Sequence, residues 1–158
     1  MGFLLRGGPR KSALGRQDWA LLVIGAADGL LPVQLQKSLF LLRQRFPEQT
    51  QGGYYEFRPV AAGNFSEQIY LDVDSLSKTG LVSIRSGRDG NRQYKLTAAG
   101  TEKVKKLEKQ VPPAIEHSLQ NLVSWVKRRS IDQLLRTSAD STGSMGPGAA
   151  PYDAARLR

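Results

Sequence analysis

Residues 63–97 constrain the fold most, because they read as a capped helix, a glycine and a β-hairpin in direct succession. Asn64 stands three residues before Glu67, which is the spacing of a capping box, and Ser66 is a rival cap. Gly80 is placed to end the helix. The apolar residues between them recur at the helical period: Ile69, Val73 and Leu76. Because a lone hairpin is not stable in water, this stretch must pack against helices from elsewhere in the chain.

The hairpin is predicted over residues 81–97, "LVSIRSGRDGNRQYKLT". Val82 and Ile84 alternate with polar residues before the tip, Tyr94 and Leu96 do so after it, and "SGRDGN" has the composition of a turn. The basic residues on or near this hairpin are Arg85, Arg88, Arg92 and Lys95. Clustered guanidinium groups at a Gly-rich tip can reach a minor groove or phosphates. The alternative is a solvated edge whose charges prevent strand pairing.

Two helices are expected ahead of this stretch, over residues 17–28 and 32–46. Pro32 suits a first helical turn, and Pro47 closes the second segment. The apolar residues of the first helix fall on one face: Trp19, Leu22, Val23 and Ala26. The second helix has an apolar and a polar face: Leu35, Leu39, Leu42 and Phe46, against Gln36, Lys37, Arg43 and Arg45. Residues 48–63 allow either one strand or an ordered loop.

Further helices are expected after the hairpin. Thr97 caps one whose apolar residues include Val104, Leu107 and Val111, and Pro112 ends it. In the segment beyond, "SIDQ" at residues 130–133 offers a second capping box. A minimal winged helix does not need this segment, so its apolar stripe must either cover the domain or form a dimer interface. That stripe is Ile115, Leu119, Leu122 and Val126, and Trp125 lies near it as a candidate anchor of the same interface.

These elements predict a mainly α protein with a small β-hairpin, of the α+β class: a winged helix-turn-helix with additional C-terminal helices. Four parts are expected in the chain of 158 residues: a flexible basic arm over 1–16, the winged-helix domain over 17–111, C-terminal helices over 112–137 and a disordered tail over 138–158. The cations of the arm, which could touch phosphates, are Arg6, Arg10, Lys11 and Arg16.

Charge and composition limit the kinds of partner and of metal site that the chain can have. A net charge of +9 and a pI of about 10.1 call for an acidic partner, which can be nucleic acid, a membrane surface or a protein. The absence of cysteine excludes disulfides and thiolate metal sites, and the single His117 makes a zinc site improbable. The start of the chain lacks a long apolar run, so we expect neither a signal peptide nor a membrane span, and a cytoplasmic location.

Catalytic chemistry finds little support in the sequence. His117 and Glu116 are adjacent on a predicted helix and do not share a face. P-loop, zinc-protease and dinucleotide-binding motifs are all missing from the sequence. We therefore expect a protein that is not an enzyme and needs neither cofactor nor metal.

Three segments carry a family resemblance. "LQKSLFLL" (35–42), "FRPVAAGNFSEQIYLDVDSLSKTGLV" (57–82) and "YKLTAAG" (94–100), in this order, resemble the Panacea-type winged-helix proteins, which are phage-associated proteins and antitoxins. The last segment alone is similar to many winged-helix regulators of the MarR and PadR kind. The family usually has tyrosine, glycine, proline, an aromatic residue and serine at 62–66, of which only the glycine, aromatic and serine are present here. The resemblance implies either DNA binding or an antitoxin or adaptor role.

The predicted helix between the Asn64 cap and Gly80 does not have the charge of a simple DNA reader. It carries Glu67, Asp72 and Asp74, and phosphates repel carboxylates. The two aspartates lie about 200° apart around the helix, so they cannot both face a groove. The candidate base contacts are Ser66, Gln68 and Lys78. The alternative is a helix that mainly packs the core.

Two further basic runs can bind phosphates or simply be solvated: Lys103, Lys105, Lys106 and Lys109, and then Lys127, Arg128 and Arg129. We therefore expect a winged-helix DNA-binding protein, a transcriptional regulator whose basic wing supplies much of the affinity. The alternatives are an antitoxin or adaptor that binds a protein such as a toxin, and a phage-associated structural protein.

Overall fold

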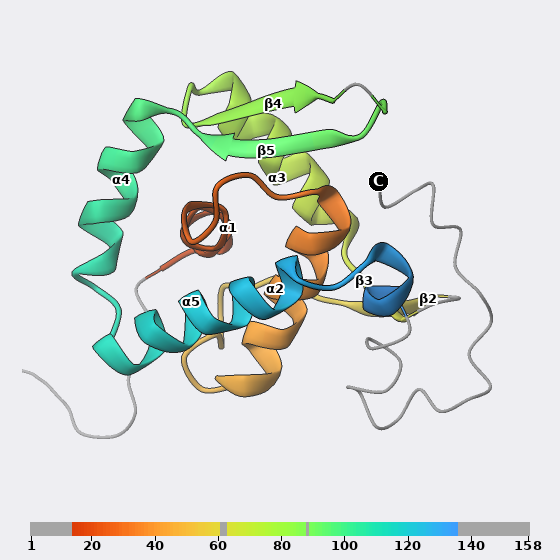
Figure 1. The fold of residues 1–158 in the computed structure, drawn as a ribbon. Helices are drawn as coiled ribbons and strands as arrows, with labels where there is room; N and C mark the ends of the chain where they lie inside the picture. The colour runs from red at the N-terminus through yellow and green to blue at the C-terminus, as the bar shows by residue number, and fades with distance from the viewer. Residues whose placement is uncertain (1–13, 61–62, 88, 136–158) are drawn as a thin grey trace, which may run out of the picture.

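The computed structural model describes residues 14–60, 63–87 and 89–135, and shows a mainly helical chain with two small two-stranded antiparallel sheets (Figure 1). The α+β class expected from the sequence is confirmed. A helical turn over residues 131–135 closes the described part. The elements before it are α1 (Arg16–Gly25), α2 (Pro32–Arg45), β2 (Arg58–Val60), β3 (Gly63–Phe65), α3 (Glu67–Lys78), β4 (Val82–Ser86), β5 (Arg92–Leu96), α4 (Ala98–Glu108) and α5 (Pro113–Lys127).

Helix α1 lies at the centre of the fold. Figure 1 views it end-on, with the β4–β5 hairpin above it, α4 to its left and α5 below. Every residue from Trp19 to Ile24 is buried. The sequence predicted a helix with one apolar face, but α1 is covered on several sides because α2, α3, α4 and β5 all pack against it.

The β4–β5 hairpin forms as predicted, with Val82 opposite Leu96 and Ile84 opposite Tyr94. Leu30 extends it by a bridge to the free edge of β5. Its amide donates to the Tyr94 carbonyl at 3.0 Å, and the Tyr94 amide donates to the Leu30 carbonyl at 2.8 Å. The β4–β5 hairpin is therefore fixed to the link between α1 and α2.

In the "TGLV" and "YKLTAAG" segments, a positive φ, a side-chain cap and a close backbone contact account for Gly80, Thr97 and Gly100. Gly80 takes a φ of 83°, and the Thr97 hydroxyl donates to its carbonyl at 2.6 Å. The Gly100 amide donates to the Thr97 hydroxyl at 3.0 Å, which confirms Thr97 as the cap of α4. A Cβ on Gly100 would lie 2.1 Å from the Leu81 carbonyl oxygen, so only glycine fits there. These residues join the hairpin to α3 and α4.

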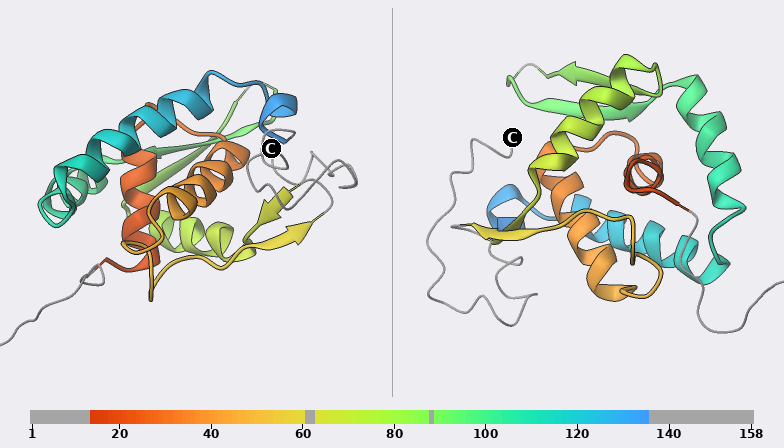
Figure 2. Two further views of the ribbon diagram at one scale, coloured as in Figure 1. Left: turned by 90° about the horizontal axis from the view of Figure 1, so that it is seen from below. Right: turned by 180° about the vertical axis from the view of Figure 1, so that it is seen from behind.

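The connection between α2 and α3 is long and contains its own hairpin. β2 and β3 pair antiparallel, with Arg58 opposite Phe65, and lie at the edge of the molecule (Figure 2). The sequence left one strand or a loop open, and the structure has two strands. This connection is longer than the turn of three or four residues that joins the helices of a helix-turn-helix.

A glutamine of α2 fixes the start of α3. The Gln36 side chain, 2% exposed, accepts from the Ser66 amide at 3.1 Å and donates to the Ser66 carbonyl at 2.7 Å. Ser66 is the N-cap residue but its hydroxyl makes no capping bond, and Asn64 lies in β3, so the predicted Asn64 capping box is wrong. Gln36 and Lys37 are buried, which also corrects their placement on an outer polar face.

The C-terminal helices belong to the same core. α5 packs against α2, and four of the five residues proposed for a dimer interface are buried within the chain: Ile115, Leu119, Leu122 and Val126. The stripe therefore covers the domain and is not a free surface for a second copy. The predicted "SIDQ" capping box is confirmed, because the Gln133 amide donates to the Ser130 hydroxyl at 3.1 Å and the Ser130 amide to the Gln133 side chain at 2.9 Å.

The boundaries differ slightly from those expected. Leu14 is buried and Arg16 begins α1, so these two residues are not part of a flexible arm. The remainder of the predicted arm, residues 1–13, and the predicted tail over 138–158 lie outside the described residues. None of the helices in the described ranges combines the length and apolar character needed to cross a bilayer.

Candidate functional site

The aspartate in the middle of α3 faces inward. Asp72 is 2% exposed and accepts three hydrogen bonds: from Arg16 Nε at 2.8 Å, the Tyr55 hydroxyl at 2.9 Å and Gln68 Nε2 at 2.8 Å. Burial and the neighbouring Asp72 carboxylate raise the pKa of Tyr55, so its hydroxyl stays a donor. Asp72 therefore links α1, the α2–α3 connection and α3, and would not meet DNA.

Two of the three candidate base contacts on α3 are engaged inside the protein. Ser66 is 4% exposed, and its backbone is bonded to Gln36. This burial contradicts a role for Ser66 in contacting a base. The side-chain amide nitrogen of Gln68 donates a hydrogen bond to the Asp72 carboxylate. Of the three candidates only Lys78 is exposed, and it forms no ion pair with a described residue.

The outer surface of α3 is acidic and apolar. Its exposed residues lie along one side of the helix, and we call them the α3 face: Glu67, Leu71, Asp74, Ser75 and Lys78. Leu71 is 54% exposed, and among the described residues it is the large hydrophobic residue whose side chain is exposed to solvent. Sequence reasoning overlooked Leu71. Its distance of two residues from both Ile69 and Val73 was the available signal, because that spacing sets it opposite the buried stripe.

The described basic residues of the hairpin lie on two different faces. Successive residues of a strand point to opposite faces, and Arg85 is paired with Gln93 whereas Arg92 is paired with Ser86. Arg85 therefore shares the outer face with Lys95, and Arg92 lies on the side of Tyr94. Burial raises the pKa of Tyr94 to about 12, and Arg92 opposes that shift.

The other predicted wing cations are also separated. Lys95 Nζ lies 3.0 Å from the Asp28 carboxylate, so its charge is partly used within the chain. Arg88 lies outside the described residues. Among the described residues of the hairpin, the exposed guanidinium groups of Arg85 and Arg92 therefore lie on opposite faces.

The two further basic runs differ in their surroundings. Lys103, Lys105 and Lys106 on α4 and Lys109 directly after it are exposed, and Lys105 pairs with Glu102 at 3.3 Å. Lys127 Nζ donates to the Gly29 carbonyl at 2.7 Å, which joins the end of α5 to the α1–α2 link. The Arg129 guanidinium lies over the Trp125 ring, 4.2 Å from its centroid.

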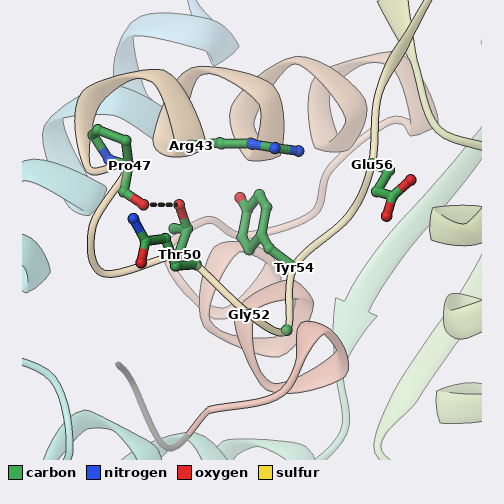
Figure 3. Close-up of a pocket in the computed structure, with 8 residues that line it drawn as sticks. Arg43, Pro47, Thr50, Gly52, Tyr54 and Glu56 are labelled. Atoms are coloured by element: carbon green, nitrogen blue, oxygen red, sulfur yellow. Dashed lines mark hydrogen bonds between the residues drawn. The ribbon is translucent and has the colours of Figure 1, made fainter. Parts of the chain in front are cut away.

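One hollow lies beside the α2–α3 connection (Figure 3). It measures about 550 Å³ and is lined by Arg43, Pro47, Thr50, Gln51, Gly52, Gly53, Tyr54 and Glu56. The Arg43 guanidinium donates to the Tyr55 carbonyl at 2.7 Å, and the Tyr54 hydroxyl donates to the Leu39 carbonyl at 2.5 Å. The Thr50 hydroxyl donates to the Phe46 carbonyl at 2.9 Å. These groups therefore hold the connection on α2.

A second hollow, the α2–α5 groove, measures about 570 Å³. It is lined by Leu41, Arg45, Asn121, Leu122, Ser124, Trp125 and Arg128. Among the described residues, no group of three or more histidine, aspartate or glutamate side chains is placed to hold a metal ion. His117 is exposed on α5.

Comparison with known proteins yields no assignment. No protein-family model matches the chain, and no curated protein matches its sequence. In the segments quoted above for the resemblance to Panacea-type proteins, a close backbone contact accounts for Gly100, and hydrogen bonds account for Gln36 and Thr97.

Proposed function

We propose that this chain is a cytoplasmic, non-enzymatic winged helix-turn-helix scaffold that binds a protein partner through the α3 face. Support for the scaffold comes from the order of α1, the Leu30 bridge, α2, α3 and the β4–β5 hairpin, with α3 packed against β4. The resemblance to antitoxins and adaptors agrees with a partner of this kind, and a toxin would be one example.

The observation that carries the proposal is Leu71, 54% exposed between Glu67 and Asp74 on the α3 face. A helix that enters a major groove passes phosphates, which repel carboxylates and gain nothing from leucine. An exposed apolar residue ringed by charges is instead typical of the centre of a protein interface. The fitting partner segment has an apolar side chain beside cationic ones.

The test uses a photo-crosslinking residue at position 71, with the same residue at Thr101 on the exposed side of α4 as the control position. The protein captured through position 71 is then purified and its affinity measured. We expect Glu67→Gln/Asp74→Asn to weaken that affinity, and Glu102→Gln/Glu108→Gln, the same charge change on α4, to leave it unaltered. Equal capture at both positions, or equal affinities of the two variants, would overturn the proposal.

DNA binding is a second candidate function. It is favoured by the exposed Arg85, Arg92 and Lys78 and by the net charge of +9. Here Arg85→Ala/Arg88→Ala/Arg92→Ala is expected to weaken binding to a random-sequence duplex and to flatten its dependence on salt. An unaltered affinity and salt dependence would remove the wing from this function.

A further inference from the structure

The α2–α5 groove lies away from the α3 face and is not used by the proposed function. It runs beside the C-terminal ends of α2 and α5, two helices that pack together beneath α1 (Figure 1). Its volume of about 570 Å³ is that of a hollow that holds a small molecule. The groove is therefore large enough for a ligand of its own.

Two arginines at the C-terminal ends of different helices line the groove. Arg45 is the last residue of α2 and Arg128 directly follows α5. Both are exposed, and neither pairs with a carboxylate among the described residues. A positive charge at the end of a helix is favoured by the helix dipole, but that effect does not require both side chains to line one hollow. Together they offer a planar, multidentate site for a carboxylate or a phosphate.

The rest of the lining is an apolar wall with two polar groups. Leu41, Leu122 and the half-buried Trp125 supply apolar surface, and Asn121 and Ser124 supply an amide and a hydroxyl. The Arg129 guanidinium stacks on the Trp125 ring at 4.2 Å from its centroid, which orients the ring and adds positive charge nearby. A ligand that satisfies all these groups has an anionic end and an apolar body.

We propose that the α2–α5 groove binds a small organic anion. Its carboxylate or phosphate is held by Arg45 and Arg128, and its apolar body lies against Trp125 and Leu41. Because the groove and the α3 face are separate surfaces, this site does not depend on the partner proposed above.

The tryptophan content of the chain permits a direct test. There are two tryptophans, and Trp19 is 2% exposed in the core, so its indole N–H signal in a ¹H–¹⁵N spectrum is an internal reference for Trp125. The full chain is titrated with benzoate, with phenyl phosphate and with neutral benzyl alcohol. We expect a saturable shift of the Trp125 signal with at least one anion, a much smaller shift with the alcohol, and no shift of Trp19. The anion that binds identifies the acidic group.

Variants separate the site from general charge attraction. Arg45→Gln/Arg128→Gln is expected to weaken binding at least about tenfold, whereas Lys105→Gln/Lys109→Gln, which removes the same charge from α4, leaves it unaltered. An unaltered Trp19 signal establishes that each variant is folded. Should the arginine variant unfold, Ser124→Glu, at an exposed position of the lining, is expected to weaken binding by adding a negative charge. The proposal is overturned if the Trp125 signal does not shift with either anion, or if it shifts as much with benzyl alcohol as with the anions. It is also overturned if all folded variants bind the anion as tightly as the wild type.

Discussion

Lys37 lies on α2 with 3% of its surface exposed, and burial lowers the pKa of its ammonium group to about 7. The unfolded chain keeps a pKa near 10.5 and so binds more protons than the folded chain between these two values. The free energy of unfolding is therefore expected to rise with pH from about 7 upward. Above about pH 10 the ionisation of tyrosine in the unfolded chain opposes this trend.

Urea denaturation from pH 6 to 9 tests this dependence. Lys37→Met removes the buried charge, and we expect it to flatten the rise and to stabilise the chain at pH 6 by on the order of 1 kcal/mol or more. Lys78→Met, at an exposed position of α3, serves as the control and should keep the slope of the wild type. A slope shared by all three proteins would show that Lys37 is not buried in this way.

Gly100 is required by close contact with the Leu81 carbonyl. A Cβ there would lie 2.1 Å from that oxygen, which also accepts from the Thr97 amide at 3.1 Å and is not free to move. Alanine gains about 0.5–1 kcal/mol over glycine in a helix, but overpacking costs about 1–3 kcal/mol or more. Gly100→Ala is therefore expected to lower the midpoint of thermal unfolding. Ala99→Gly, at an exposed position of the same turn, measures the propensity effect alone, and a Gly100→Ala protein as stable as the wild type would refute the contact.

The start of α3 depends on one side chain of α2. Gln36→Ala leaves the buried Ser66 amide and carbonyl without their partners, and each such group costs about 1–3 kcal/mol. We expect a lower free energy of unfolding in urea together with faster hydrogen exchange at the Ser66 amide. Gln44→Ala, on the exposed side of α2, should change neither quantity. Retained protection at Ser66 in Gln36→Ala would contradict the role of this glutamine.

Elements whose signals are local could be predicted, and those that depend on distant partners could not. The β4–β5 hairpin and the caps at Thr97 and Ser130 follow from neighbouring residues, and all three are confirmed. The burial of Gln36 and Asp72 depends on contacts with residues far along the chain. Because both side chains are polar, the local sequence gives no sign that they are buried. The separation of Arg85 from Arg92 followed from the strand period once the register was known.

Helix α5 supplies buried residues to the single hydrophobic core and packs against α2. Leu122 is 4% exposed in the single chain, so Leu122→Ala is expected to cost about 2–5 kcal/mol in free energy of unfolding without altering the molecular mass in solution. Light scattering and urea denaturation measure the two quantities, with the exposed Gln120→Ala as the control. A variant that changed its association state while keeping its stability would restore the stripe as a dimer surface.

The candidate surfaces were only partly accessible to sequence reasoning. The number of lysines and arginines shows that the chain is basic, but not which of them bind groups of the protein itself. Lys127, for example, donates to the Gly29 carbonyl, a contact that only the folded structure reveals. The α2–α5 groove brings together residues from two helices, and no local pattern indicates it. By contrast, Leu71 departs from the apolar period of its own helix, so the sequence alone was enough to mark it.

That the α3 face meets a protein and not a duplex is tested most directly by fluorescence anisotropy of a labelled duplex at low ionic strength. The measurement compares the wild type with Glu67→Gln/Asp74→Asn. If α3 lies away from the phosphates, the two proteins bind the duplex with affinities within about twofold of each other. If α3 enters a groove, removing two carboxylates relieves about 1 kcal/mol of repulsion each, and the variant binds at least about tenfold more tightly. The first result is the one predicted here, and the second would contradict it.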